Sequence, residues 1–491
     1  DRLRSRGLGD VYKRQEIQEM VEKAMRECIE VNQAQSVICL VSDVKTGAIL
    51  AMCMNPCYDP NDPPRNDAET LTELMRLTAI SDVYEPGSTF KILTAASALD
   101  SGVTTPQDSF YCSAKITVDG DTIRCWGRPH GAETMADGLK NSCNPVFVEL
   151  ALRMGTDTFY RYLTAFGLGK KTGIDLPGES PGILITSRNV KRVDLARIGF
   201  GQSVALTPIQ MMMAANSVIN GGKLMKPYIV SEIQTPDGET LERFHPTVMA
   251  APIRPETSDT MRLLLERVVS EGGGKNAAIA GYRIGGKTGT AQVYKNGRVV
   301  RDTHIGSFYG FAPVNDPQVS ILVIVKEADV PIDYGGTTAA PFARQIMQEM
   351  LPYLGIDPEN DEKDEEIEVP ALKGLTIGDA KRKLSQVGLE SVTDGANTVV
   401  LDQLPPAGAK LVKGGHVMLY TAGSEELTPE ELVCVPDLTG LGDVDCARLV
   451  RQRGLMMSMT GQGLCTEQSP AAGEYVQPGT TIFLLMAGDD E

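Results

Sequence analysis

The sequence has few basic residues for its length, and it has no long apolar run. Its 491 residues contain 47 Lys and Arg against 64 Asp and Glu, which gives a formal net charge of −17. This balance argues against nucleic acid as a partner, because phosphate contacts need clustered Lys and Arg. No apolar run approaches the roughly 18 residues that a membrane-spanning helix needs; the longest, such as Ile321–Val325, have the length of a strand. The composition, 42% hydrophobic and 23% charged, is that of a globular protein with about two to four domains.

Patterns typical of metal sites are also scarce. The 10 cysteines form no Cys-x-x-Cys pair and there are only 4 histidines, so we expect no metal and no cofactor. Cys112 and Cys125 flank a predicted hairpin over 115–123. A disulfide between them in an oxidising compartment and a pair of reduced thiols both remain open. Cys143 is predicted to be a packing residue, with a reactive thiol as the alternative.

Charge is unevenly spread along the chain. Residues 357–368 contain eight acidic residues and one Lys, and residues 369–491 contain sixteen acidic and nine basic residues. Each of these two stretches carries −7 of the total of −17, whereas the first 356 residues are nearly balanced. A charge break of this kind predicts a domain boundary. The composition of 357–368 is that of a solvated acidic linker.

The last part of the chain contains an internal repeat with an offset of 65 to 66 residues. The matching pairs are Val369–Leu375 with Val435–Leu441, Gly388–Leu389 with Gly454–Leu455, and Gln403–Gly408 with Gln468–Gly473. Repeats of this length form small modules, and each copy is predicted to contain a helix followed by strands. The predicted bounds are 369–423 for the first module, 424–433 for a linker and 434–489 for the second module.

The residues before the acidic linker predict one larger domain over 16–356. Residues 1–15 are polar and lack apolar periodicity, so we expect a non-native stub and a natural N-terminus that is missing from this chain. Apolar residues recur at helical spacing over 16–32. Two strands are predicted over 36–42 and 48–54, around a turn.

Three short motifs could mark a serine acyltransferase: Ser-x-x-Lys, Ser-x-Asn and Lys-Thr-Gly. Each occurs more than once, so the surroundings must decide between the copies. Ser-x-x-Lys occurs at 42–45 and 88–91, Ser-x-Asn at 142–144 and 187–189, and Lys-Thr-Gly at 45–47, 171–173 and 287–289. The Gly-x-Ser-x-Gly sequence at 178–182 is a rival nucleophile motif. We reject it because Pro181 has no N–H for the oxyanion hole and no strand is predicted before Ser180.

Of the two Ser-x-x-Lys copies, Ser88 and Lys91 have the surroundings that the chemistry needs. The dipeptide Pro86-Gly87 interrupts the chain, and a mostly apolar, buried helix is predicted over 90–99. Residues three apart share a helix face, so the amine can reach the hydroxyl. The helix N-terminus favours developing negative charge. Burial of the lysine would lower its pKa toward that of a general base.

Local structure separates the remaining copies. Ser42–Lys45 crosses from a strand into a turn, so no helix presents the serine. Ser142–Asn144 suits a loop tip at the head of the next helix. Lys287–Gly289 is predicted to lie on an edge strand that a ligand approaches closely. Lys171–Gly173 is predicted to be a loop, and Ser187–Asn189 an ordinary helix cap.

Together these residues resemble the transpeptidase of a class B penicillin-binding protein. The motifs are Ser88-Thr89-Phe90-Lys91, Ser142-Cys143-Asn144 and Lys287-Thr288-Gly289-Thr290, in this order. The resemblance covers about residues 16–354, and the C-terminal repeats resemble two PASTA domains. It implies a mixed α/β (α+β) fold in which an antiparallel sheet is flanked by helices, followed by two small α+β modules. It also points to a division or sporulation system of a Gram-positive bacterium.

The resemblance implies a role for each motif residue. Ser88 would attack the carbonyl of a D-Ala-D-Ala stem peptide and form an acyl-enzyme, with Lys91 as the general base. Ser142 would relay a proton to the leaving D-Ala, and Asn144 would orient the substrate amide. The third motif would bind the substrate carboxylate, and its residues are Lys287, Thr288, Gly289 and Thr290. The backbone N–H groups of Ser88 and Thr290 would form the oxyanion hole.

The resemblance also implies ligands, partners and a location. The ligands are peptidoglycan stem peptides and β-lactam antibiotics, and the partners are glycosyltransferase or divisome membrane proteins. The location is the extracytoplasmic face of the cell membrane, with an anchoring N-terminal helix that this chain lacks. Two alternatives remain: a β-lactam-binding scaffold with little turnover, and a D,D-carboxypeptidase or β-lactamase, in which water takes the acyl group. Trp126 and His130 are expected to shape a loop near the cleft.

Overall fold

The computed structural model describes most of the chain. It leaves out residues 1–3, 60, 236–237, 296–297, 359–365, 394–398, 413–415, 421–432, 443–445, 448, 451–452, 454, 462, 473–474, 477–479 and 488–491. The predicted linkers over 357–368 and 424–433 therefore lie mostly outside the described residues.

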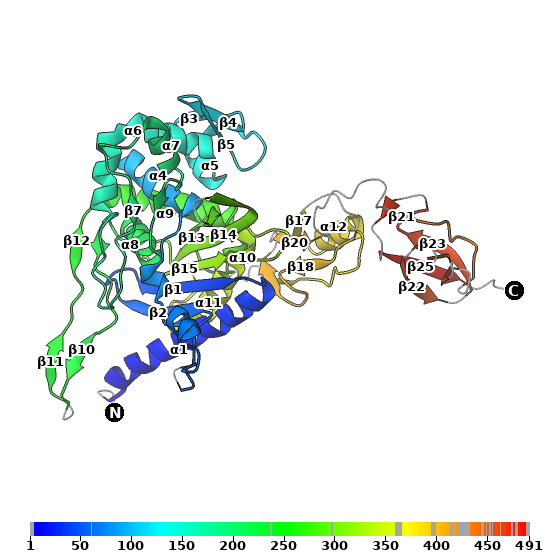
Figure 1. Cartoon of the computed structure of the whole chain (residues 1–491), viewed down its shortest axis with the longest axis horizontal. Coiled ribbons are helices and arrows are strands. Elements are labelled where there is room, and N and C mark those ends of the chain that lie inside the picture. Colours follow the sequence, from blue (N-terminus) through cyan, green and yellow to red (C-terminus); the bar gives the residue numbers. More distant parts are fainter. Residues whose placement is uncertain are drawn as a thin grey trace. The chain divides into compact units, whose positions relative to one another are not determined.

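A five-stranded antiparallel sheet forms the centre of the N-terminal part (Figure 1). In spatial order its strands are β13 (Gly285–Lys295), β14 (Arg298–Ala312), β15 (Val319–Lys326), β1 (Ser36–Asp43) and β2 (Ile49–Asn55). The prediction of two strands around a turn near the N-terminus is confirmed by β1 and β2. The prediction that Lys287–Gly289 lies on an edge strand is confirmed too, because β13 is the outermost strand of the sheet.

Helices cover both faces of this sheet. They are α1 (Arg4–Val31) and α11 (Ala340–Tyr353) on one face, and α4 (Lys91–Asp100) and α8 (Pro208–Ile219) on the other. Successive side chains of a strand point to opposite faces. Along β1, Val37 and Cys39 therefore pack in the cluster that contains α1 and α11, whereas Ile38 and Leu40 pack in the cluster that contains α4 and α8. This arrangement confirms the predicted antiparallel sheet flanked by helices.

Helix α1 begins at Arg4. The helical backbone predicted over 16–32 thus continues into the residues that we expect to be a stub. That these residues are non-native stays a prediction.

Further helices and two short hairpin-like ladders form a layer beside the sheet. The helices are α5 (Met135–Lys140), α6 (Asn144–Ala165), α7 (Arg192–Ile198) and α9 (Pro255–Ser270). The ladders pair β3 (Ser109–Cys112) with β6 (Gly131–Thr134) and β4 (Lys115–Val118) with β5 (Asp121–Arg124). The hairpin predicted over 115–123 is therefore confirmed. Its turn residues Asp119 and Gly120 have φ values of 50° and 91°, which an Asp-Gly turn accommodates.

The remaining elements of the N-terminal part are short. They are α2 (Ala68–Leu74), α3 (Thr78–Ser81), η1 (Gly87–Phe90), β7 (Ile183–Leu184), β8 (Val204–Ala205), β9 (Leu224–Met225), β10 (Glu232–Gln234), β11 (Thr240–Arg243), β12 (Val248–Ala250), η2 (Lys275–Ala277) and α10 (Gly335–Thr338).

The two C-terminal repeats have the same strand arrangement. The first contains β16 (Glu366–Glu368), α12 (Ile377–Gln386), β17 (Glu390–Thr393), β18 (Asp402–Leu404), β19 (Lys410–Val412) and β20 (His416–Tyr420). The second contains β21 (Val433–Cys434), β22 (Met456–Gly461), β23 (Leu464–Ser469), β24 (Tyr475–Val476) and β25 (Thr481–Ala487). The sheet orders β17-β20-β18 and β22-β25-β23 correspond, as do the ladders β16-β19 and β21-β24.

One hydrogen bond recurs at matching positions of the repeat. Gln403 Nε2 donates to the Pro370 carbonyl oxygen at 3.0 Å, and Gln468 Nε2 donates to the Pro436 carbonyl oxygen at the same distance. The repeat in the sequence is thus also a repeat in the structure. One boundary prediction is wrong: the end of the predicted linker, Glu366–Glu368, is strand β16, because it pairs with β19.

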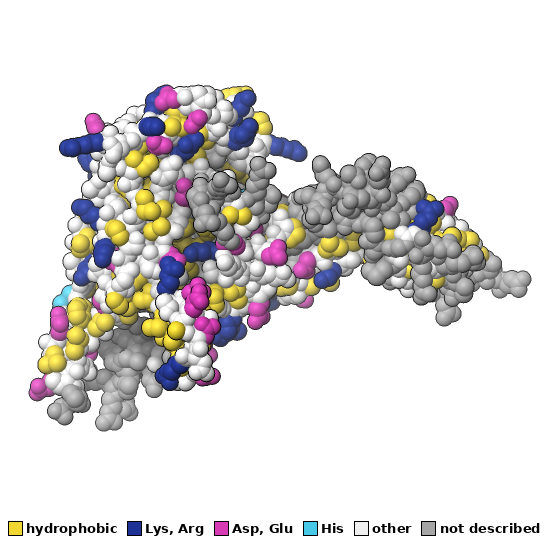
Figure 2. Space-filling view, viewed as in Figure 1, with side chains coloured by type: hydrophobic (Ala, Val, Ile, Leu, Met, Phe, Trp, Pro, Cys, Tyr) yellow, Lys and Arg dark blue, Asp and Glu magenta, His cyan; other side chains and the backbone are white. Residues whose placement is uncertain are grey.

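On the visible face of the N-terminal part, basic and acidic side chains alternate among apolar ones (Figure 2). This mixture agrees with the near-neutral charge of the first 356 residues. Among the helices that the structure describes, none is long and apolar enough to cross a membrane.

Candidate active site

Ser88 lies in η1, a single turn of 3-10 helix that runs directly into α4. Gly87 begins this turn with a φ of 53°, a conformation that favours glycine. A Cβ atom at Gly87 would come within 2.6 Å of the carbonyl oxygen of Thr290. The glycine therefore lets the turn that carries Ser88 lie against β13, the strand of the Lys-Thr-Gly motif. Ser88 is half-buried, so part of its surface remains open to a substrate.

Lys91 is the first residue of α4, and its side chain is fully buried. Its Nζ donates hydrogen bonds to the Ser142 carbonyl oxygen at 2.6 Å and to Asn144 Oδ1 at 2.7 Å, and it lies 3.3 Å from Ser142 Oγ. Within the described part of the chain, no hydrogen bond joins Lys91 to Ser88. Burial lowers the pKa of Lys91 from 10.5 to about 7, against the opposing effect of nearby thiols and a carboxylate. An amine with this pKa can accept a proton near neutral pH.

Ser142 lies in the connection between α5 and α6. Its φ is 56°, which is uncommon for a residue other than glycine and often marks a functional position. The next helix begins at Asn144, as the sequence predicts, with Pro145 in its first turn. The backbone of this connection thus directs both the carbonyl and the hydroxyl of Ser142 toward the lysines.

Lys287 approaches Ser142 from the sheet. Its side chain is fully buried, and its Nζ donates to Ser142 Oγ at 3.0 Å and to the Thr288 carbonyl oxygen at 3.1 Å. Burial, and then repulsion by Lys91, lower the pKa of Lys287 well below its ordinary value. Two lysines from different elements therefore meet at one serine hydroxyl.

The Lys-Thr-Gly strand packs closely against the Ser88 turn. A Cβ atom at Gly289 would come within 2.9 Å of Thr89 Cγ2 and 3.1 Å of the Pro86 carbonyl oxygen. Any larger residue at position 289 would separate β13 from η1. Thr288 and Thr290 are half-buried on either side of Gly289. The structure therefore brings the three predicted motifs together from η1 and α4, the α5–α6 connection, and β13.

The rejected copies of the motifs lie in other environments. Lys45 is exposed and pairs with Asp316 at 2.6 Å. In the second Lys-Thr-Gly copy, Thr172 contacts a carboxylate: its backbone N–H donates to Glu179 Oε1 at 2.6 Å. The prediction that Ser187–Asn189 caps a helix is wrong, because α7 begins only at Arg192 with Lys191 as its N-cap. The side chain of Asp194 accepts the Lys191 backbone N–H at 3.2 Å and fixes that later start.

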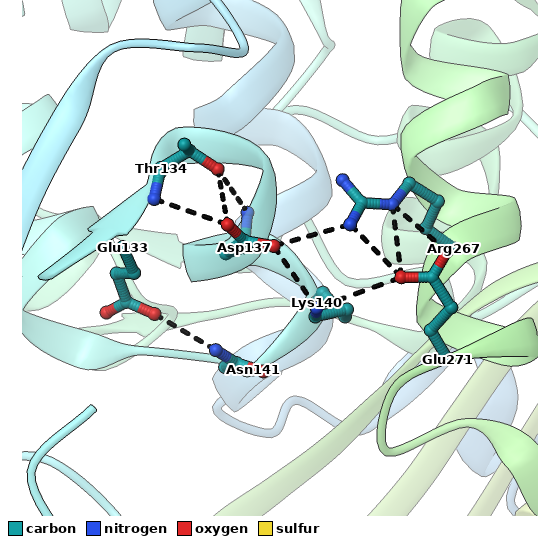
Figure 3. A network of polar contacts seen from close by, with 7 residues as sticks. All are labelled: Glu133, Thr134, Asp137, Lys140, Asn141, Arg267 and Glu271. Atoms are coloured by element: carbon teal, nitrogen blue, oxygen red, sulfur yellow. Dashed lines mark hydrogen bonds and ion pairs between the residues drawn. The ribbon is translucent and has the colours of Figure 1, made fainter. Parts of the chain in front are cut away.

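A polar network ties helix α5 to α9 beside the Ser142 loop (Figure 3). Asp137 accepts hydrogen bonds from Thr134 Oγ1 at 2.7 Å and from Arg267 Nη2 at 3.3 Å, and Lys140 Nζ lies 3.1 Å from its carboxylate. Arg267 also pairs with Glu271 at 3.1 Å. The hydrogen bond from Thr134 is the largest cause that lowers the pKa of Asp137 to about 2, so its charge persists to low pH.

Only part of this network had a signal in the sequence. Thr134 and Asp137 form a capping box at the start of α5, a pattern that can be recognised from spacing. The pairing with α9 depends on tertiary packing, so no sequence pattern predicts it. The same holds for a second link of this region, Asn141 Nδ2 donating to Glu133 Oε2 at 3.1 Å.

The end of the β4–β5 hairpin and the residues just after it also contact the Ser142 loop. Asn144 Nδ2 donates to the Arg124 carbonyl oxygen at 3.0 Å, and Trp126 Nε1 donates to the Asn141 carbonyl oxygen at 2.9 Å. Trp126 is 64% exposed, so it contributes a polar contact rather than core packing. This agrees with the expectation that Trp126 shapes a loop near the cleft.

Four residues of this region could hold a metal ion. The ligand atoms of Cys112, Cys125, His130 and Cys143 all lie within 4.8 Å of one another. Cys112 and Cys125 are free thiols in the structure, so the disulfide alternative is not formed. No spacing rule predicts this group from the sequence, because its members are 5 to 31 residues apart.

Comparison with known proteins defines the class first. Residues 37–348 match the family described as the penicillin binding protein transpeptidase domain, and residues 367–423 and 433–488 each match the PASTA domain. The chain therefore belongs to the penicillin-binding protein transpeptidases. The resemblance drawn from the three motifs and the two repeats is confirmed.

Particular relatives agree with this assignment. The chain is 38% identical to stage V sporulation protein D of Bacillus subtilis over 84% of this chain and 64% of that protein. It is 30% identical to the peptidoglycan D,D-transpeptidase FtsI of Escherichia coli over 70% of this chain and 56% of that protein. The chain thus spans less than two thirds of the length of these relatives.

Solved structures give the same fold. The transpeptidase domain of Burkholderia pseudomallei penicillin-binding protein 3 matches with a TM-score of 0.61 and 26% identity, over 70% of this chain and 96% of that one. Penicillin-binding protein 3 of Mycobacterium tuberculosis, in complex with aztreonam, matches with a TM-score of 0.65 and 28% identity, over 70% of this chain and 78% of that one.

Proposed function

We propose that the chain is a peptidoglycan D,D-transpeptidase that cross-links stem peptides through a serine acyl-enzyme. The observation that carries this proposal is the meeting of two buried lysines, Lys91 and Lys287, at Ser142 Oγ, with the half-buried Ser88 in the turn that leads into Lys91. Burial lowers the pKa of Lys91 to about 7, so its amine can accept a proton near neutral pH, and burial also lowers the pKa of Lys287.

In the first half-reaction Ser88 Oγ attacks the carbonyl carbon of the penultimate D-Ala. Lys91 accepts the hydroxyl proton, and the N–H groups of Ser88 and Thr290 stabilise the oxyanion, where one such donor is typically worth about 2.7–4 kcal/mol. The C–N bond to the terminal D-Ala then breaks. Ser142 passes a proton to the leaving amine, and an ester to Ser88 remains.

In the second half-reaction an amine of a neighbouring stem peptide attacks the ester. The new amide bond forms as the Ser88 ester bond breaks, and Ser88 regains its proton. Asn144 orients the substrate amide. The substrate carboxylate lies by Lys287, Thr288 and Thr290 along the open edge of β13. Extended peptides commonly add to such a strand edge.

The proposal includes a setting for this reaction. Peptidoglycan lies outside the cell membrane, so we place the chain at its extracytoplasmic face, anchored by a segment outside this sequence. Sporulation is the process that the name of one relative supports, and division is the alternative. β-Lactams would acylate Ser88 as mimics of the dipeptide. Glycosyltransferase or divisome proteins are the expected partners.

The test is a cross-linking assay with a stem-peptide donor that ends in D-Ala-D-Ala and an acceptor amine. Mass spectrometry measures the cross-linked dimer and the released D-Ala for the chain and for Ser88→Ala. The proposal predicts a dimer that depends on Ser88. Release of D-Ala without a dimer would show a carboxypeptidase, and penicillin labelling without D-Ala release would show a scaffold.

A further inference from the structure

Three thiols and one imidazole gather next to the α5–α6 connection. Cys112 and Cys143 are fully buried, Cys125 is nearly so, and none of the three forms a disulfide. With His130, their ligand atoms lie within 4.8 Å of one another. We propose that these four residues bind one Zn²⁺ as a closed structural site that holds the catalytic loop in place.

The distances suit a tetrahedral ion after a small contraction. Zn–S bonds of about 2.3 Å and Zn–N bonds of about 2.0–2.1 Å place neighbouring ligand atoms roughly 3.6–3.8 Å apart. Cys125 Sγ and His130 Nδ1 lie 3.9 Å apart, close to this separation. Four protein ligands fill the coordination sphere and leave no position for substrate, which is the pattern of structural rather than catalytic zinc.

The choice of ion follows from the donors. Thiolates select soft or borderline ions, and three sulfurs with one imidazole nitrogen form one of the sets that structural zinc uses. Each cysteine would bind as a thiolate and release its proton to solvent. Glu133 Oε1 lies 3.7 Å from His130 Nδ1, so a buried carboxylate stands beside the imidazole.

Simple packing accounts less well for the cluster. A buried cysteine can behave as a small apolar residue. That role explains neither the convergence of three thiols nor the imidazole among them. The hairpin layer over 109–134 also has little core of its own. In this fully described range, the buried apolar side chains besides the cysteines are Phe110, Val118 and Ile123. Layers with so few apolar contacts commonly need a metal or disulfide to stabilise them.

The ligands come from segments that already meet at the active site. Cys125 stands between Arg124 and Trp126, and Cys143 between Ser142 and Asn144. Two hydrogen bonds already connect these segments. The Asn144 side chain donates to the Arg124 carbonyl oxygen, and the Trp126 side chain donates to the Asn141 carbonyl oxygen. An ion bound to Cys125 and Cys143 would fasten the same two segments. It would thereby stabilise the uncommon backbone conformation of Ser142 and the position of Asn144.

The test measures metal binding in the whole chain, purified under reducing conditions and stripped with a chelator. Zn²⁺ is added back, and bound zinc per chain is determined by elemental mass spectrometry after gel filtration. Co²⁺ is added in a parallel sample, where thiolate-to-cobalt charge-transfer absorption and tetrahedral d–d bands report the ligand set. The variants are Cys112→Ser and His130→Ala. Their matched controls are Cys57→Ser and His245→Ala, both exposed residues outside the cluster.

We expect about one zinc per chain in the parent and in both controls. Both cluster variants should bind zinc more than about tenfold more weakly and lose the charge-transfer absorption. If a cluster variant does not fold, the parent titration and cobalt spectrum still decide. The proposal is overturned if the reduced parent binds no stoichiometric zinc, if folded cluster variants bind it as the controls do, or if cobalt shows no thiolate absorption. None of these readouts depends on acyl transfer, so the result is separate from that of the proposed function.

Discussion

Two copies of Ser-x-x-Lys, Ser42–Lys45 and Ser88–Lys91, have the same spacing and different surroundings. Ser42 is fully buried in β1, and its hydroxyl donates to the Asp43 carbonyl oxygen at 3.1 Å. The side chain of Lys45 is 53% exposed. In the other copy the arrangement is reversed: Ser88 is partly open, and Lys91 is fully buried.

This difference shows that the backbone, rather than the motif, makes the site. In a strand, residues three apart point to opposite faces, whereas on a helix they lie on the same face. Burial lowers the pKa of Lys91, whereas Lys45 is exposed. The Ser88 copy therefore has a buried amine one helical turn from its serine, and the Ser42 copy does not.

The largest expected effect is the loss of the nucleophile. Ser88→Ala should abolish acylation by fluorescent penicillin because no other hydroxyl occupies its position. Ser42→Ala should label at the parent rate. Gel fluorescence against time measures both. Equal labelling of the two variants would contradict the comparison.

Removal of the base should come next. Lys91→Ala is expected to lower the second-order acylation rate constant by about 10²–10⁴-fold, the range for a general base. Lys45→Ala removes a lysine with the same spacing to a serine and should leave the rate unchanged. Stopped-flow acylation kinetics provide the measurement, and circular dichroism confirms that both variants fold. Similar rates for the two lysine variants would show that burial does not select the base.

A similar pair tests the second motif. Asn144→Ala removes the amide that accepts from Lys91 Nζ at 2.7 Å and donates to the Arg124 carbonyl oxygen at 3.0 Å. Hydrogen bonds to charged groups contribute about 1.5–3 kcal/mol, so acylation should slow by about 10- to 150-fold. Asn189→Ala, from the rejected Ser-x-Asn copy, should have no effect on the same stopped-flow rate.

The pH dependence should follow Lys91. Its pKa is lowered to about 7, so it gains a proton below this pH and can no longer accept one from Ser88. The acylation rate constant should therefore fall about tenfold per pH unit below pH 7 and level off above it. Lys287, Glu133, Cys125 and Cys143 also face this amine and set the exact midpoint. A rate that rises as the pH falls below 7 would exclude Lys91 as the base.

The smallest effect should come from the ion pair of the unused copy. Lys45 and Asp316 are 53% and 66% exposed at a separation of 2.6 Å. Exposed pairs contribute about 0–1 kcal/mol. Asp316→Ala should therefore change the free energy of unfolding by less than about 1 kcal/mol in urea titration. A larger loss would mean that the turn at Lys45 has a structural role that the comparison overlooks.

Much of this architecture could be predicted because it depends on local sequence patterns. The strands β1 and β2, the β4–β5 hairpin and helix α4 follow from apolar spacing and turn residues. The three motifs predict a candidate site because each has its own context of helix start, loop tip or edge strand. Resemblance to a known family then supplied the residue roles, which spacing alone did not.

The rest depends on tertiary packing and could not be predicted in this way. Cys112, Cys125, His130 and Cys143 come from four segments, and no spacing rule brings them together. The same holds for Asp137 and the residues of α9 that it pairs with. The predicted helix cap at Ser187 is wrong because α7 begins later, where the Asp194 side chain accepts the Lys191 backbone N–H.

The central claim is that Ser88 alone becomes acylated. The most direct measurement is peptide mapping by mass spectrometry after incubation of the chain with penicillin. We expect one penicilloyl group per chain, on the peptide that contains Ser88 and on no other. An adduct on Ser42 or Ser180, or a folded chain that acquires no adduct, would contradict it.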